Sequence, residues 1–345
     1  MEIRLEDQPN CLLCGGEGQL LYSNMPDRII SVEGSWNLLQ CKSCGLIWLH
    51  PRPIKDDIGK LYVKYHTHEA AKSTRRSSSA RDGIRQAILK AVFGYPIQEK
   101  RFYWLGSLLS RISVIRDTVG AQIMMLGHEK RGRLLDVGAG NGTFLKTMQD
   151  LGWEVTGIEP DPDAARIVRD VYGISVYAQT LDDTDLPDES FDVITMDHVI
   201  EHFSDPLRSL SKVYQLLKPG GRLVLMTPNI KSLGHAVFKS SWLHLDPPRH
   251  FYLFDHNSLE TMVKSAGFTI ENSRTVASSA WWVWISSNAI RTHGQIRNGQ
   301  LAASDLRFSM KLRGVFFELA EELRRLKLLP GASDSGEELY LMARK

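Results

Sequence analysis

The sequence predicts an α/β fold in which a mostly parallel sheet carries helices on both faces, preceded by a small cysteine-rich module. Three observations indicate this. From residue 133 onward, apolar strand-like runs alternate with amphipathic helical segments. A glycine-rich turn, GAGNG at 138–142, follows the first of these runs. All four cysteines lie in two C-x-x-C-G units within the first 45 residues.

Length and charge favour a globular protein of more than one unit. The chain has 345 residues and a net charge of +2, so it is not a nucleic-acid polycation. Charge is uneven, however: residues 60–133 contain 15 Lys/Arg against 5 Asp/Glu. This basic stretch could face phosphates, an anionic membrane or only solvent. We expect a zinc-binding module over 1–60, a basic linker with helices over 61–130 and a cofactor-binding domain over 131–345.

The N-terminus predicts a cytoplasmic protein. MEIRLEDQPN contains no apolar run of the kind found in secretory signals. No segment approaches the roughly 20 apolar residues that a membrane-spanning helix needs.

The cysteines predict a structural Zn²⁺ site. CLLCG and CKSCG supply Cys11, Cys14, Cys41 and Cys44. Clustered cysteines in a reducing compartment indicate metal binding, with two disulfides or free thiols as the alternatives. The runs LLYSNM and WNLLQC read as two strands joined through SVEGS, and four thiolates leave no open position for catalysis.

The stretch between the module and the first sheet strand divides into two parts. Residues 66–83 are polar, Ser-rich and basic, and indicate a linker or mobile loop. Residues 84–128 have apolar positions at helical spacing.

The elements of the α/β domain follow in order. LLDVG is a buried strand, GAGNG a tight turn and TFLKTMQDLG a helix. WEVTGIEPD, ISVYA, FDVITMD and RLVLMTPN are the next strands, with helices in PDPDAARIVRDVYG and DPLRSLSKVYQLL. FDHNSLETMVKSAGF is a helix with cap signals at Asn257 and Ser258, and FTIENSRTV and ELYLMAR are the last strands.

The turn and the acid that follows it suit a nucleoside cofactor. Glycines allow a ligand to approach the backbone, and the helix start offers free N–H groups. Glu159 ends the second strand, 17 residues after Gly142, where an acid can accept ribose hydroxyls.

The sequence resembles the class I S-adenosylmethionine-dependent methyltransferases. The matching pieces, in order, are LLDVGAGNG (134–142), GIEPD (157–161), LPDESFDVITMDHVIEHFSDP (186–206), LKPGGRLVLMTPN (217–229), DPPRHFYLFDHNSLETMVKSAGF (246–268) and ELYLMARK (338–345). The N-terminal cysteine pairs resemble the zinc-binding domain fused to some of these enzymes, including sugar C-methyltransferases. The resemblance implies a Rossmann-like, seven-stranded, mostly parallel sheet with a zinc-ribbon-like N-terminal module.

The resemblance also implies the residues of the cofactor site. The expected S-adenosylmethionine contacts are Asp136, Gly138, Gly140, Asn141, Gly142, Glu159, Thr180, Leu181, Asp197 and His198. The cofactor is already activated, so the protein mainly aligns the acceptor and removes its proton. Our leading candidate for the base is His250, with His198 and His202 as further catalytic candidates and His244 and Asp246 as competitors.

The run HVIEH at 198–202 fits the inverted zinc-peptidase pattern H-x-x-E-H. A strand precedes it and Asp205-Pro206 starts a new helix after it, so its histidines do not share one face of a long helix. Some methyltransferase relatives have a glutamate at the His198 position, forming an E-x-x-E-H cluster that can bind a divalent ion, and His198 replaces that first acid here, which disfavours a metal at this run. We therefore place this run at the floor of the methyl-donor pocket.

Residues 277–336 form an insertion between the last two strands. SAWWVWISSNAI and the amphipathic LRFSMKLRGVFFELAEELRRLKLL could form an acceptor lid, a dimer face, a peripheral membrane contact or extra packing.

The function that we predict is methyl transfer to a hydroxyl or carbon of a small molecule, a sugar or glycan precursor. The alternatives are a nucleic-acid or protein methyltransferase that grips its substrate with the zinc module and basic stretch, and a non-catalytic cofactor binder. The base-amine motif N/D-P-P-Y/F is absent after the fourth strand, where the chain reads DHVI, so we expect no nucleic-acid partner.

Overall fold

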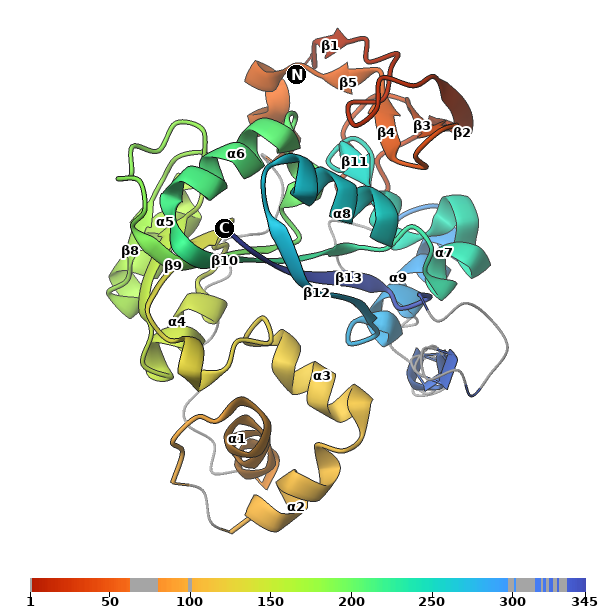
Figure 1. Cartoon of the computed structure of the whole chain (residues 1–345). Helices are drawn as coiled ribbons and strands as arrows, with labels where there is room; N and C mark the ends of the chain where they lie inside the picture. The colour runs from red at the N-terminus through yellow and green to blue at the C-terminus, as the bar shows by residue number, and fades with distance from the viewer. Residues whose placement is uncertain are drawn as a thin grey trace.

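The computed structural model describes residues 2–62, 80–98, 101–296, 301, 314–317, 319–320, 323–324, 328 and 334–345. A central sheet runs through the large domain, with the N-terminal module against one side and helices α1 to α3 on the other (Figure 1). Within these described ranges, no helix has both the length and the apolar character needed to cross a membrane.

The central sheet has seven strands in the order β12-β13-β10-β9-β6-β7-β8. Strands β6 to β10 pair in parallel, whereas β13 pairs antiparallel with both β10 and β12. The strands are β6 (Arg133–Val137), β7 (Glu154–Ile158), β8 (Ser175–Tyr177), β9 (Phe191–Asp197), β10 (Leu217–Pro228), β12 (Thr269–Val276) and β13 (Glu338–Arg344). The predicted seven-stranded, mostly parallel α/β sheet is confirmed.

Alternate residues of the buried strands face two separate apolar layers. Leu135, Ile194 and Leu225 pack in the layer that also holds α6 and α8, while their neighbours Leu134 and Val193 pack in the other layer with α4 and α5. Figure 1 shows α6 and α8 on one face of the sheet and α3 and α4 on the opposite face. Burial on both faces explains why these strands are continuous apolar runs. The flanking helices are α4 (Thr143–Asp150), α5 (Pro162–Tyr172), α6 (Pro206–Leu216), α7 (Leu233–Phe238) and α8 (His256–Ser265).

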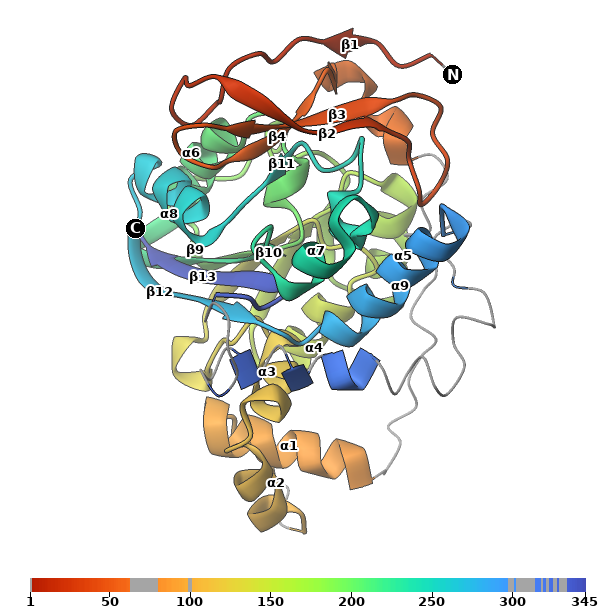
Figure 2. The same ribbon diagram turned by 90° about the vertical axis from the view of Figure 1, so that its right-hand side faces the viewer.

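The N-terminal module has a two-stranded sheet, made of its first and last strands, and a small antiparallel sheet that the large domain completes. Its strands are β1 (Leu5–Glu6), β2 (Gly18–Met25), β3 (Trp36–Cys41), β4 (Ile47–His50) and β5 (Arg52–Pro53), followed by the 3₁₀ helix η1 (Lys55–Tyr62). The predicted hairpin is β2–β3. Strand β11 (Tyr252–Leu253) of the large domain pairs antiparallel with β4, which gives the order β11-β4-β3-β2 (Figure 2). The module and the domain therefore share a sheet.

Three segments differ from expectation or lie outside the described residues. The helical stretch is three helices, α1 (Ala80–Phe93), α2 (Tyr103–Leu109) and α3 (Ser113–Ala121), because Gly94, with φ +72°, ends the first. Helix α1 thus begins inside the predicted linker, whose residues 66–79 lie outside the described part of the chain. In the insertion, the tryptophan-rich run forms α9 (Ala280–His293), and most of 297–333 lies outside the description.

The cap of α8 corrects the sequence analysis. The N-cap is Asp255 rather than Asn257, because its Oδ1 accepts a hydrogen bond from the backbone N–H of Ser258 at 2.9 Å. The Ser258 hydroxyl oxygen accepts the Asp255 N–H in return, at 3.0 Å, so Ser258 is the N3 member of a capping box.

We predict that Trp48→Ala lowers the free energy of unfolding of the whole chain by about 3–5 kcal/mol, the usual loss for a buried Trp. Trp48 is 1% exposed and packs in the core shared with α6 and α8. Because the core is shared, urea denaturation should show one cooperative transition that moves as a unit. Trp104→Ala, at a side chain 68% exposed, is the control and should change stability by less than about 0.5 kcal/mol. Two transitions, only one of them shifted, would contradict the shared core.

Candidate functional site

The glycine loop joins the end of β6 to the start of α4. The N–H groups of Gly138 and Ala139 both donate to the carbonyl of Ile158 on β7, at 2.8 and 3.0 Å. Gly138 has φ +80°, and a Cβ there would lie 2.5 Å from Val199 Cγ2. Only glycine fits this position, because a side chain would be strained and would collide with the turn after β9.

Glu159 ties the tip of β7 to the same loop. Its Oε2 accepts the N–H of Gly140 at 2.7 Å, and its Oε1 accepts the N–H of Asp161 at 3.0 Å. Burial raises the pKa of this carboxyl, although both backbone bonds act against the rise. A Cβ built on Gly140 would meet no atom within 4 Å, so the loop is open toward the edge of the sheet. An open backbone beside an acid is a cradle that a nucleoside-bearing ligand can fill.

Asp136 lies beneath the loop and is 4% exposed. Its Oδ1 accepts a hydrogen bond from the Thr195 hydroxyl at 2.7 Å. Burial raises the pKa of Asp136 to about 8, and the nearby carboxylates of Asp197 and Glu159 add to the rise. In the unliganded protein this carboxyl therefore keeps its proton at neutral pH, and a cationic ligand would favour its ionised form.

The other expected cofactor residues follow the carboxyl ends of neighbouring strands. Asn141 Oδ1 accepts the Thr143 N–H at 3.1 Å at the start of α4. Thr180 is exposed beyond β8 while Leu181 is buried, and Asp197 is the exposed last residue of β9. These positions lie along one edge of the sheet, because parallel strands end on the same side.

A cluster of histidines adjoins this edge. His198 precedes the 3₁₀ turn after β9 and His202 is the last residue of that turn, whereas His244 and His250 come from the segment between β10 and β11. The rings of His198 and His244 stack at 5.4 Å, and those of His202 and His250 meet edge-on at 4.7 Å. The structure thus brings together all three predicted catalytic candidates and the competitor His244. The 3₁₀ turn η3 (Ile200–His202) agrees with a strand end, not with the long helix of a peptidase.

His198 is held by two buried acids. Its Nε2 lies 3.1 Å from Glu338 Oε1, and its Nδ1 lies 3.4 Å from Glu201 Oε1. Burial acts to lower the pKa of His198, but the two carboxylates outweigh it and raise the pKa well above the ordinary value. This imidazole is therefore positively charged at neutral pH and is not a free base.

His202 and His250 are neutral by contrast. Burial lowers the pKa of His250 to about 4, and burial with the neighbouring His250 lowers the pKa of His202 to about 4. His250 Nδ1 lies 2.7 Å from the carbonyl oxygen of His244, so Nδ1 carries the proton and donates it there. Its Nε2 consequently carries the lone pair.

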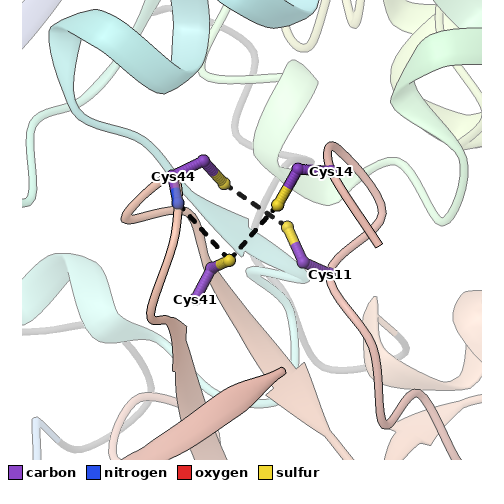
Figure 3. A group of neighbouring side chains, drawn as sticks. All are labelled: Cys11, Cys14, Cys41 and Cys44. Atoms are coloured by element: carbon purple, nitrogen blue, oxygen red, sulfur yellow. Dashed lines mark hydrogen bonds between the residues drawn. The ribbon is translucent and has the colours of Figure 1, made fainter. Parts of the chain in front are cut away.

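The described residues contain two groups with the donor types of metal sites. Cys11, Cys14, Cys41 and Cys44 lie with their sulfurs within 4.8 Å of one another (Figure 3). Glu201, His202 and His250 form the second group, with ligand atoms within the same distance. Glu201 Oε1 is buried with no hydrogen bond, although it forms the ion pair with His198. Neutral imidazoles and a carboxylate are donors that divalent transition metals accept.

Sequence reasoning missed several partners of these histidines. Glu338 is the first residue of β13, and the sequence places it far from His198. The Tyr62 hydroxyl lies 3.0 Å from His202 Nδ1, and the Asp27 carboxylate binds Arg249 next to His250. These contacts join segments 140 or more residues apart, so no local pattern reveals them. Among these segments, only the run Arg249-His250 in DPPRHF was singled out from the sequence as part of the candidate site.

Comparison with known proteins shows that this chain is similar to methyltransferases. A family model described as "Methyltransferase domain" matches residues 98–273. A ubiquinone biosynthesis O-methyltransferase of Cereibacter sphaeroides is 30% identical over 168 residues, covering 45% of this chain and 68% of the relative. The enzyme of the same name from Chelativorans is 31% identical over 183 residues, covering 48% and 71%. An S-adenosylmethionine-dependent methyltransferase structure from Mesorhizobium loti has TM-score 0.44 and 21% identity, covering 66% of this chain and 97% of that one.

We predict that His250→Gln makes the fold less sensitive to acid. The unfolded chain takes up a proton at His250 near pH 6.5, whereas the folded chain does so only near pH 4. The stabilisation from a neutral His250 is therefore complete above pH 6.5 and is lost as pH falls from 6.5 to 4. Chemical denaturation across this window should show the wild type losing about 3 kcal/mol more than the variant. Parallel curves for the two proteins would argue against a buried neutral His250.

Proposed function

Since this chain belongs to the class I S-adenosylmethionine-dependent methyltransferases, we propose that it transfers the methyl group to an oxygen of a small-molecule acceptor. Two lines of support meet here. The curated relatives are O-methyltransferases. The observation that carries the proposal is His250, which is buried and neutral. Its Nε2 carries a lone pair and lies near the edge of the sheet at which the glycine loop also lies. An acceptor hydroxyl needs such a group to take its proton.

We assign the cofactor to the open cradle. Gly138, Gly140, Asn141 and Gly142 would follow its amino-acid portion, with Asp136 beneath them. Glu159 would exchange its bond to the Gly140 N–H for the ribose hydroxyls. S-adenosylmethionine supplies a methyl group already activated on a sulfonium. The remaining expected contacts are Thr180 and Leu181 toward the adenine and Asp197 and His198 toward the methionine portion.

The histidines would divide the work on the acceptor. His250 Nε2 takes the hydroxyl proton as the oxygen attacks, while the Nδ1 bond to the His244 carbonyl fixes the ring. His198, whose two ring nitrogens face Glu201 and Glu338, would hold these two acids in place beside the acceptor. His202, neutral and in edge contact with His250, orients that ring.

An aromatic hydroxyl is the first acceptor class to test. The relatives named above act in ubiquinone biosynthesis. They give no support to the sugar or glycan precursor expected from the sequence, so sugars form the second arm of the test.

We predict an O-methyl ether product when the purified chain is incubated with S-adenosylmethionine and substituted catechols. Mass spectrometry should find the mass gain of one methylene group, and fragmentation should place it on oxygen. His250→Gln should lower kcat by about 10²–10⁴ without changing cofactor affinity, because only proton removal is lost. Methylation of carbon or nitrogen would contradict the O-methyl proposal. Near-normal turnover by the variant would exclude His250 as the base.

We further propose that the four cysteines hold structural zinc. The Cys11–Cys44 and Cys14–Cys41 sulfurs lie 3.5 and 3.4 Å apart. A tetrahedral Zn²⁺ with bonds of about 2.3 Å places its sulfurs about 3.8 Å apart, so a small relaxation closes the site. Four thiolates would complete the coordination, and the ion would act on folding.

Elemental analysis of the purified protein should find one zinc per chain. Cys44→Ser should lower this content and the melting temperature, because one thiolate of the site is lost. Ser43→Ala, between two of the cysteines, leaves all four sulfurs in place and should keep the metal. Equal zinc content in Cys44→Ser and wild type would refute the assignment.

A further inference from the structure

A buried ion triad joins the N-terminal module to the histidine segment. Arg249 is 0% exposed and donates from Nη1 and Nη2 to the two carboxylate oxygens of Asp27, at 2.8 and 2.7 Å. Its Nε donates to Asp246 Oδ2 at 2.9 Å, and its Nη2 also donates to Asp246 Oδ1. A planar guanidinium bound as a fork has one fixed orientation, which a lysine could not reproduce.

Asp27 is itself fixed by the loop that follows β2. Its Oδ1 accepts the N–H groups of Ile29 and Ile30 at 2.9 and 3.2 Å, and its Oδ2 accepts that of Val32 at 3.0 Å. Burial opposes its ionisation, but the bonds from Arg249 and the backbone outweigh burial and lower the pKa of Asp27. The charge that orients Arg249 is therefore present at neutral pH.

Arg249 lies between the two neutral histidines along the hydrogen-bond network. Its carbonyl oxygen accepts from His202 Nδ1 at 3.0 Å, and the next residue is His250. The N–H groups of Arg249 and His250 both donate to the carbonyl of Asp246, at 2.9 and 3.1 Å. Moving the guanidinium would therefore move the carbonyl that holds one histidine and the backbone that carries the other.

The residues that follow His250 add backbone contacts between the N-terminal module and the segment that carries the histidines. Leu49 N–H donates to the Phe251 carbonyl at 3.0 Å, and Tyr252 pairs with Trp48 on β4. Phe251 N–H donates in turn to the Glu201 carbonyl at 2.8 Å, inside the turn that carries His198 and His202. The histidine segment is thus bound to the module on one side and to the end of β9 on the other.

From these contacts we propose that Asp27 of the N-terminal module is a positioning residue for methyl transfer, which through Arg249 sets the orientation of His202 and His250. The proposal rests on the proposed function for its kinetic part. The module then acts in the chemistry without touching the acceptor, because its carboxylate fixes the guanidinium that fixes the two imidazoles.

The test is Asp27→Asn, with Asp117→Asn as a matched control. Asp117 is also a buried carboxylate bound by a guanidinium from another element, Arg274, at 2.8 and 3.3 Å. It joins α3 to β12 and contacts none of the four clustered histidines through these bonds. Both variants neutralise a buried carboxylate that binds a guanidinium, although the Arg274 side chain is 27% exposed and that of Arg249 is fully buried. The ring signals of His202 and His250 therefore distinguish a change of position from a general loss of stability.

We expect Asp27→Asn to lower kcat for catechol methylation by at least about tenfold, as small misplacements of a catalytic group do. S-adenosylmethionine affinity, measured by calorimetry, should stay within about twofold, because the cradle is untouched. In protein carrying labelled histidine, NMR should show the ring signals of His202 and His250 shifted in Asp27→Asn and unchanged in Asp117→Asn. The signals are assigned with His202→Gln and His250→Gln.

Equal kcat losses in the two variants, or unshifted ring signals in Asp27→Asn, would overturn the proposal. If Asp27→Asn does not fold, Arg249→Lys keeps the charge and removes the fork, and the same ring shifts and kcat loss are expected. The NMR readout needs no acceptor. If the ring signals of His202 and His250 shift in Asp27→Asn but the wild-type protein methylates no hydroxyl, the proposed function is refuted and the positioning by Asp27 is upheld.

Discussion

Parallel pairing of β6 with β7 and β9 places the ends of these strands at one edge of the sheet, and the candidate site depends on this constraint. The glycine loop, Glu159 and the turn after β9 all begin where a strand ends. Strand β13 runs antiparallel, so its first residue, Glu338, reaches the same edge from the opposite chain direction. The glycine loop and the acid–histidine cluster therefore lie along the same edge of the sheet.

Charge at this edge is stable only because it is paired. Glu201 and Glu338 are buried, and the protonated His198 between them forms an ion pair with each. Arg249 does the same for Asp27 and Asp246. His202 and His250 remain uncharged because burial lowers the pKa of each to about 4. The burial that disfavours their protonation thus leaves each imidazole neutral, with a lone pair on one ring nitrogen.

The sequence was sufficient for the succession of strands and helices along the chain and for the glycine loop, because both follow from local patterns: apolar runs, helix starts and a turn that needs positive φ. It also made His250 the leading candidate for the base, because this histidine lies in the segment after the fifth strand and its ordinary pKa is near neutrality. It could not reveal that Asp27 meets Arg249 or that β11 completes the sheet of the module, since these contacts join segments some 200 residues apart. The prediction of the N-cap of α8 was wrong for another reason. Asp255, Asn257 and Ser258 are all good cap residues, and only the backbone path decides among them.

The place of β13 between β10 and β12 has a consequence for how the protein is made. Among the sheet strands, β12 pairs with β13 alone, yet 61 residues, 277–337, separate the two in the chain. At ribosomal rates of about 5–20 residues per second, β12 waits about 3–12 s for its partner to be synthesised. Glu338 arrives with that partner. During this interval the nascent chain lacks one of the two acids that hold His198, so the histidine cluster is completed only when the last strand of the sheet has been made.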